Sequence, residues 1–302
     1  MKNTKFNRND ILAIVKKHKL GKITKISYSK SGMVNPCLFL NDKYVLRINV
    51  RDPEIAKFKR EEIAFNKLKK EGFCPKKVFL NADKKIIPYT YIITEKLKGK
   101  EIEKDWSKFS KKKKKDFSFQ AGRNLAIIHK AKMPWFGDLV KGGEKGNFKT
   151  WQGFILDYLK TKISQSKRLK VLNKKQGKRI LDEYKKFKPV LSKVKTPSLL
   201  HDDYHLDNMV YYKNKITGIF DFEWARAGDP EFDLKKLEKL DNEDFYKGYT
   251  SIRKLSNDFD KKIVFYKLIS SVGLLPVAKR HWSEKSVRNL KKEIKFYLER
   301  LK

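Results

Sequence analysis

The fold is decided by the stretch LLHDDYHLDNMV at residues 199–210, together with ITGIFDFE at residues 216–223. Residues 209–212 and 216–220 are rich in the types that favour strands. Three polar residues at 213–215 separate them and predict a three-residue turn. The sequence therefore predicts a β-hairpin that directly follows a polar loop.

The register of this hairpin brings two oxygen-bearing side chains together. If Tyr212 pairs with Ile216, the hairpin puts Asn208 opposite Phe220. Asn208 and Asp221 then emerge together at the open end of the hairpin. Oxygen ligands in this arrangement suit Mg²⁺, which takes a few protein oxygens and completes its shell with substrate phosphates and water.

The polar loop resembles the catalytic loop of a known fold. His201-x-Asp203-x-x-x-x-Asn208, followed by the strand-end Asp221, resembles the catalytic loop and the metal-binding aspartate of the protein-kinase-like fold. Asp203 comes five residues before Asn208, which puts it near the predicted metal without making it a required ligand.

Two further features narrow the resemblance. His205 follows two residues after Asp203, and residues 228–234 read GDPEFDL. In these features the chain is similar to aminoglycoside phosphotransferases and choline kinases rather than to protein kinases. The resemblance covers roughly residues 20–300, and residues 199–234 carry its specific motifs.

The resemblance implies a role for each position of the motif. Asp203 would accept the proton of the substrate hydroxyl and aim that hydroxyl at the γ-phosphate, while Asn208 and Asp221 would hold Mg²⁺. Most of the catalysis in phosphoryl transfer is positioning and charge neutralisation, so these groups need placement more than unusual reactivity. Structural support of the loop would come from His201, His205 and Asp233.

A cation for the nucleotide phosphates is predicted on a strand at residues 43–50. Side chains alternate along a strand, so Arg47 lies on the same face as Val45. The Val45 side chain is suited to line one side of an adenine site. In the helix predicted at residues 53–71, Glu61 falls on an otherwise apolar stripe. A buried carboxylate without a partner is costly, and Arg47 is the obvious partner.

The resemblance implies that Arg47, paired with Glu61, contacts the α- and β-phosphates in the place where the family has a lysine or an arginine. Arginine keeps the charge of lysine but not its shape. Ser31 and Asn35 lie in a segment that resembles the family's nucleotide loop between the first two strands, with a single glycine. A plain hairpin turn explains that segment equally well.

The predicted fold class is α+β, a protein-kinase-like two-lobed fold. A small antiparallel sheet with one helix forms an N-terminal nucleotide-binding lobe at residues 1–95, and residues 96–102 connect it to a larger, mainly helical lobe at 103–302. The helical lobe carries the catalytic loop and the substrate site. The hinge whose backbone binds adenine would comprise Thr94, Glu95 and Leu97.

The net charge of the chain is +38. Residues 201–250 form the one acidic block, with 7 Lys and Arg against 12 Asp and Glu. A basic excess occurs in proteins that bind nucleic acid, an anionic membrane surface or an anionic ligand. Here the positive charge is spread and mostly lysine, so a codon or solubility bias is the preferred interpretation, with nucleic-acid binding as the alternative.

Composition also indicates whether the chain is folded and in which compartment it is expected. Hydrophobic residues make up 40% and aromatic residues 13% of the chain, which argues against disorder. The longest apolar runs, such as residues 11–15, are far shorter than the roughly 20 residues that span a bilayer. No signal peptide is recognisable, and Cys37 and Cys74 form no metal or redox spacing. We expect a cytoplasmic protein without membrane insertion.

Four residues are weaker candidates for substrate contact. Glu223 and Trp224 directly follow the metal strand. Asp241 and Asp244 would form an acidic wall for a cationic substrate, or they would be the N-cap and a first-turn acid of a helix. The helix interpretation is preferred.

We therefore expect a phosphotransferase that uses ATP, or alternatively GTP, with Mg²⁺. It would phosphorylate a hydroxyl of a small molecule, such as an aminoglycoside or a similar amine-bearing acceptor. The alternatives are a choline- or ethanolamine-type kinase and a catalytically dead kinase-like basic protein that binds nucleic acid. The intact Asp203, Asn208 and Asp221 argue against the dead scaffold. His205, and the lack of a recognisable activation segment before Asp233, disfavour a protein kinase.

Overall fold

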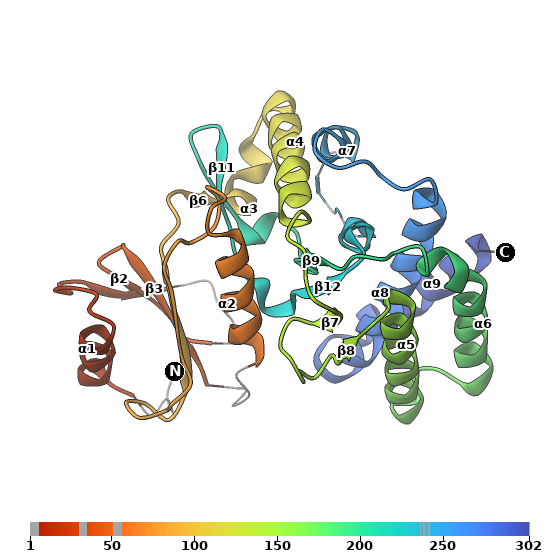
Figure 1. Ribbon diagram of the computed structural model, residues 1–302, viewed down its shortest axis with the longest axis horizontal. Helices are drawn as coiled ribbons and strands as arrows, with labels where there is room; N and C mark the ends of the chain where they lie inside the picture. Colours follow the sequence, from red (N-terminus) through yellow and green to blue (C-terminus); the bar gives the residue numbers. More distant parts are fainter. Residues whose placement is uncertain are drawn as a thin grey trace. The chain divides into compact units, whose positions relative to one another are not determined.

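Helices and antiparallel strands make up an α+β structure, as the sequence predicts (Figure 1). The structure is a computed structural model that describes residues 6–29, 35–50, 56–235, 237, 239–240 and 242–301. By internal packing the chain forms two compact units. The first comprises Met1–Lys113 with Leu206–Ala225, and the second comprises Lys114–His205 with Arg226–Lys302. The functional lobes that the sequence suggests, with a connector at 96–102, stay a prediction.

A five-stranded antiparallel sheet organises the first unit, in the order β1-β2-β3-β5-β4. Its strands are β1 (Ile26–Tyr28), β2 (Cys37–Leu40), β3 (Tyr44–Asn49), β4 (Val78–Asn81) and β5 (Thr90–Glu95). Alternation along β3 sends Leu46 and Ile48 into one core and Arg47 to the other face. Helix α2 (Ala56–Leu68) contacts the Arg47 face through Phe58.

The opposite face of this sheet is covered by α1 (Arg8–Lys17), a second helix where the sequence analysis expects only one. The Asn7 side chain accepts from the N–H of Asp10, whose side chain in turn accepts from the N–H of Asn7. This capping box starts the helix. Ile11 and Ile14 then pack into the same core as Leu46.

A three-stranded sheet in the first unit contains the predicted hairpin, in the order β11-β10-β6. Its strands are β6 (Lys100–Glu101), β10 (Met209–Tyr212) and β11 (Lys215–Ile219). Short helices adjoin it: α3 (Ile102–Asp105), η1 (Trp106–Lys108), η2 (Leu206–Asn208) and η3 (Phe222–Trp224).

The predicted turn of this hairpin is wrong by one residue. Tyr212 pairs with Lys215 instead of Ile216, so the loop has two residues. A bulge that accommodates Thr217 restores the expected register, and Met209 pairs with Ile219. The Thr217 hydroxyl donates to the Lys98 carbonyl oxygen, which fixes the extra residue.

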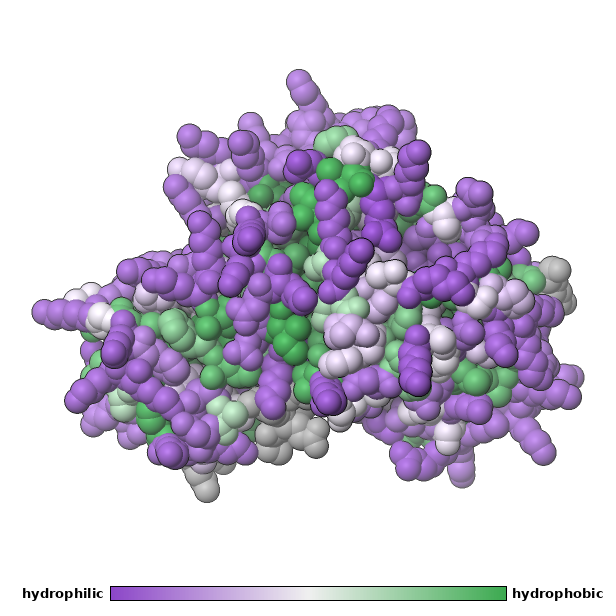
Figure 2. Space-filling view, viewed as in Figure 1, coloured by the Kyte–Doolittle hydropathy of each residue, from purple (hydrophilic) through white to green (hydrophobic). Residues whose placement is uncertain are grey.

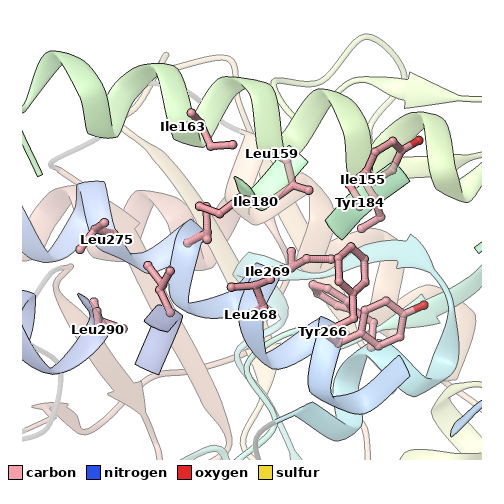
Figure 3. Packing of buried hydrophobic residues seen from close by; sticks show 14 of the residues in the cluster. Ile155, Leu159, Ile163, Ile180, Tyr184, Tyr266, Leu268, Ile269, Leu275 and Leu290 are labelled. Atoms are coloured by element: carbon pink, nitrogen blue, oxygen red, sulfur yellow. The ribbon is translucent and has the colours of Figure 1, made fainter. Parts of the chain in front are cut away.

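The second unit is mainly helical. Its helices are α4 (Lys111–Ile128, beginning in the first unit), α5 (Trp151–Arg168), α6 (Lys174–Leu191), α7 (Asn242–Thr250), α8 (Phe259–His281) and α9 (Glu284–Arg300). Apolar side chains of α5, α6, α8 and α9 meet in one core (Figure 3). This agrees with the predicted fold class, in which the larger part of the chain is mainly helical.

A four-stranded sheet in the second unit, ordered β8-β7-β12-β9, is not anticipated by the sequence analysis. Its strands are β7 (Phe136–Asp138), β8 (Asn147–Phe148), β9 (Ser198–Leu200) and β12 (Arg226–Gly228), and η4 (Pro230–Lys235) follows the last. Strand β9 leads directly into His201, so this sheet anchors the start of the polar loop.

Hydrophilic side chains cover most of the face seen in Figure 2, as the high lysine content leads one to expect. Among the described residues, no helix is long and apolar enough to cross a membrane.

Candidate active site

The predicted pair of Arg47 and Glu61 is confirmed. The guanidinium of Arg47 on β3 contacts the Glu61 carboxylate on α2, and it also lies 5.3 Å from the centre of the Phe58 ring. Glu61 is 1% exposed, and its neighbours on the predicted stripe, Phe65 and Leu68, are buried too. The arginine thus offsets the cost of burying this carboxylate.

A second carboxylate reaches the same arginine. Glu223 Oε1, in η3, lies 3.6 Å from Arg47 Nη1. The backbone at this point is fixed to α2, because the fully buried Arg60 donates from Nη1 to the Glu223 carbonyl oxygen at 3.5 Å. Phe222 packs edge-on against Phe65, with ring centres 5.5 Å apart. Glu223 therefore has a defined partner that the sequence analysis did not anticipate.

The mouth of the hairpin presents Asn208 and Asp221, as predicted. The N–H of Phe220 donates to the Asn208 carbonyl oxygen at 3.1 Å, so these two residues face each other across the hairpin. Asp221 comes next and adopts a left-handed backbone conformation, with φ of 65°. Few residues other than glycine, asparagine and aspartate adopt this conformation readily.

The donor set at this mouth fits a hard cation. Oδ1 of Asp221 is buried and has no hydrogen-bond partner among the described residues. A buried carboxylate oxygen without a partner is costly unless a cation or another donor reaches it. Asn208, 6% exposed and across the hairpin from Phe220, carries the second oxygen-bearing side chain predicted for this mouth. Mg²⁺ prefers a small number of such oxygens.

No group of three or more His, Cys, Asp or Glu side chains that could hold a metal occurs within the described ranges.

In the second unit, Asp233 holds the start of the polar loop. Its carboxylate accepts from the backbone N–H groups of His201 at 2.7 Å and Asp202 at 2.9 Å. His129 Nε2 lies 3.1 Å from the same carboxylate, and its Nδ1 is 2.9 Å from the Tyr249 hydroxyl. The predicted bracing role of Asp233 thus has a concrete geometry.

Asp203 interacts directly with a histidine of its own loop. His205 Nε2 lies 3.3 Å from Asp203 Oδ2. Burial acts to raise the pKa of the Asp203 carboxyl, but the hydrogen bond and the charge interaction with His205 outweigh it, and the pKa is lowered. The Asp203 side chain is therefore an ionised carboxylate at neutral pH.

Sequence reasoning missed the part played by Asp202. Its carboxylate pairs with Arg226, and it accepts from Lys235 Nζ at 2.7 Å, with all three side chains less than a tenth exposed. Burial would raise the pKa of Asp202, but the two cations lower it to about 2. Asp202 has φ of 63°. The basic residues at 226 and 235 were visible in sequence, but only the fold shows which acid they pair with.

Other acids of the acidic block are also paired internally. Lys262 Nζ lies 2.5 Å from Asp229 Oδ2 and 2.7 Å from Glu231 Oε2. The Tyr266 hydroxyl donates to Asp229 at 2.5 Å, and the Ser256 N–H donates to Glu231 at 2.6 Å. Much of the negative charge at 201–250 therefore neutralises buried cations, which weakens the case for an acidic wall.

The remaining predicted nucleotide contacts have the following surroundings. The side-chain oxygen of Asn35 accepts from the Val50 N–H at 3.2 Å. Thr94 pairs with strands on both sides, and Glu95 donates its N–H to the Lys77 carbonyl oxygen at 3.2 Å. A contact of Glu95 with adenine would therefore use its carbonyl oxygen. Leu97 packs next to Gly218.

The candidate substrate residues have separate surroundings. Trp224 is 45% exposed, and Lys57 Nζ lies 5.4 Å from its ring centre. Asp244 is a first-turn acid of α7 and lies 3.6 Å from Lys115 Nζ, as the helix interpretation expects. Ser31 and Asp241 lie outside the described residues.

Comparison of the sequence with known protein families identifies one family. The model of the phosphotransferase enzyme family matches residues 29–238. No curated protein sequence matches the chain significantly.

Among solved structures, the gentamicin complex of APH(2")-IIa is 19% identical, with a TM-score of 0.68 and 97% of each chain covered. ADP-bound APH(2'')-Ib is 20% identical, with a TM-score of 0.67 and 97% of each chain covered. The GDP complex of aminoglycoside 2'-phosphotransferase-IIIa is 16% identical, with a TM-score of 0.66, covering 98% of this chain and 99% of that one. These similarities show that the chain shares their fold.

Proposed function

The chain belongs to the phosphotransferase enzyme family, and from this premise we propose that it transfers the γ-phosphate of a nucleoside triphosphate to a hydroxyl group of a small molecule. The observation that carries the proposal is the mouth of the hairpin. There, a buried oxygen of Asp221 has no partner among the described residues, one position after Phe220, which lies opposite Asn208. A structural turn would have no reason to keep such an acceptor.

Asp203 is the proposed catalytic base. Its lowered pKa keeps the carboxylate ionised at neutral pH, ready to accept a proton. The acceptor hydroxyl oxygen forms a bond to the γ-phosphorus, and the bond from that phosphorus to the bridging oxygen breaks. The hydroxyl proton passes to Asp203, and a nucleoside diphosphate leaves. The histidine beside it, His205, orients the carboxylate.

Asn208 and Asp221 are the residues that would hold Mg²⁺. When bound, the cation would neutralise the phosphate charge that builds up during transfer. Asp221 would contribute the carboxylate oxygen that is buried without a partner among the described residues, at a strand end whose backbone is left-handed.

Arg47 is the proposed partner of the α- and β-phosphates. Its contact with the buried Glu61 fixes the direction of the guanidinium, and its side chain remains 20% exposed. An arginine held in this way presents N–H donors to phosphate oxygens. The backbone of Thr94, Glu95 and Leu97 is proposed to bind the base, ATP first and GTP as the alternative, since both ADP and GDP complexes occur among the similar structures.

The acceptor class is proposed as a small molecule with a free hydroxyl. Gentamicin is bound in one of the similar structures, so aminoglycosides are the first compounds to test. The test measures nucleoside diphosphate release with ATP or GTP over aminoglycosides, macrolides, choline, ethanolamine and amino-sugars. Acceptor-dependent release that requires Mg²⁺ is expected. No release with any acceptor, together with no binding of ATP or GTP, would refute the proposal.

A further inference from the structure

Arg47 contacts two carboxylates that differ in burial and in distance. The Glu61 side chain is 2% exposed and is in direct contact with the guanidinium. The Glu223 side chain is 18% exposed, and its 3.6 Å separation from Arg47 Nη1 is an ion pair beyond hydrogen-bond range. Glu61 is therefore the permanent partner, and Glu223 is the weaker one.

The surroundings allow only the Glu223 side chain to leave. Glu61 lies on a buried stripe of α2, and moving its charge away from Arg47 would leave a carboxylate buried among apolar groups. The Glu223 backbone is held by Arg60 and by the packing of Phe222. The Glu223 side chain itself is 18% exposed, so its carboxylate already borders solvent and can turn outward while the main chain stays in place.

We propose that Glu223 occupies Arg47 in the nucleotide-free protein and is exchanged for nucleotide phosphates, so that it sets the affinity of the site. The inference rests on the proposed function, because it takes Arg47 as the phosphate contact. One guanidinium cannot favourably hold two carboxylates and a polyphosphate at once, since each added negative charge repels the others. The exposed carboxylate is the one that phosphate displaces.

Two consequences follow for binding. Phosphate must first break the Arg47–Glu223 pair, and it then carries its negative charge near the displaced carboxylate. Both effects weaken the binding of phosphate-bearing nucleotides. Neither acts on a nucleoside without phosphate, because its binding does not involve Arg47.

The test compares Glu223→Gln with the unchanged protein by calorimetric titration of ADP and adenosine. Replacement by glutamine keeps the shape and removes the charge. We expect ADP to bind about threefold to tenfold more tightly to Glu223→Gln, with the affinity for adenosine unchanged. Glu62→Gln is the matched control, a half-buried carboxylate one position after Glu61 on α2, and should leave both affinities unchanged.

Glu223→Asp provides a second test. The shorter side chain cannot reach Arg47, so this variant should also bind ADP more tightly. Weaker or unchanged ADP binding in these variants would overturn the inference, since it would make Glu223 a support of Arg47 or irrelevant to it. An equal gain for adenosine would also overturn it. If the unchanged protein binds neither ADP nor ATP, the proposed function itself fails, which is a different outcome.

Discussion

Asn208 lies directly across the hairpin from Phe220, whose N–H donates to the Asn208 carbonyl oxygen at 3.1 Å. This one backbone contact ties the end of the polar loop to the residue before Asp221. It depends on the bulge at Thr217, which shifts the register by one residue between the turn and the mouth. The geometry of the proposed metal site is thus set by hairpin pairing, and the polar loop leads directly into β10.

The first prediction concerns the metal. Asp221→Asn removes the charge at the buried oxygen for which the described residues provide no partner, and it keeps the size of the side chain. We expect Mg²⁺ to strengthen binding of a non-hydrolysable ATP analogue to the unchanged protein by about tenfold or more, about 1.4 kcal/mol, and to have little effect on the variant. Calorimetric titration with and without Mg²⁺ measures this.

The exposed Asp207, next to Asn208, offers the control. Asp207→Asn should retain the full Mg²⁺ effect. An equal Mg²⁺ effect in Asp221→Asn and the unchanged protein would remove Asp221 from the metal site.

The second prediction concerns the pair of Arg47 and Glu61. Glu61→Gln removes the buried carboxylate that fixes Arg47. We expect the unfolding free energy to fall by about 1–3 kcal/mol, because a buried charged contact is lost while Arg47 keeps Glu223 and solvent. ADP affinity should fall as well, since the guanidinium is no longer held in place. Urea denaturation and titration with ADP measure the two effects.

Glu62→Gln again serves as the comparison on the same helix, and neither quantity should change by more than about 0.5 kcal/mol. If Glu61→Gln binds ADP as tightly as the unchanged protein, Arg47 is not the phosphate contact.

The third prediction concerns the buried pair beside Asp203. Asp202→Asn removes the carboxylate that pairs with the buried Arg226. The same substitution removes the partner of Lys235. The expected loss of unfolding free energy at pH 7 is about 3–5 kcal/mol. Asp182→Asn, at an exposed helical ion pair with Lys185, should have a much smaller effect, because solvent screens exposed ion pairs.

The same pair gives a pH dependence of stability. The pKa of Asp202 is lowered to about 2 in the folded protein, below its unfolded value of about 3.9. Its contribution, about 2.6 kcal/mol in all, is therefore complete above about pH 5 and is lost as the pH falls from there through 2. Denaturation series at several acidic pH values should show this slope in the unchanged protein and a shallower one in Asp202→Asn. Equal slopes would contradict the lowered pKa.

Much of the helical part could be predicted from sequence, because helices of four or more turns show their apolar period clearly. In the helix Glu284–Arg300, for example, Leu290, Ile294 and Leu298 are buried at helical spacing. Helix α1 was missed although its capping residues, Asn7 and Asp10, are readable in the sequence. Strands β9 and β12 have three residues each, too few to show a period.

The candidate site likewise has contacts that could be predicted from sequence and contacts that could not. Arg47 and Glu61 could be paired from sequence, since a carboxylate on an apolar stripe demands a nearby cation. The contact between Arg47 and Glu223 could not, because it joins residues 176 positions apart through the packing of η3 on α2. The pair of Asp202 and Arg226 likewise depends on the second-unit sheet.

The central claim is that Asp203 is the base of a nucleotide-dependent phosphotransfer. The most direct measurement is transfer of labelled γ-phosphate to the best acceptor of the panel by the unchanged protein and by Asp203→Asn. We predict that kcat falls by about 10²-fold or more, with ADP affinity and thermal stability retained. Turnover by Asp203→Asn at the rate of the unchanged protein would contradict the account.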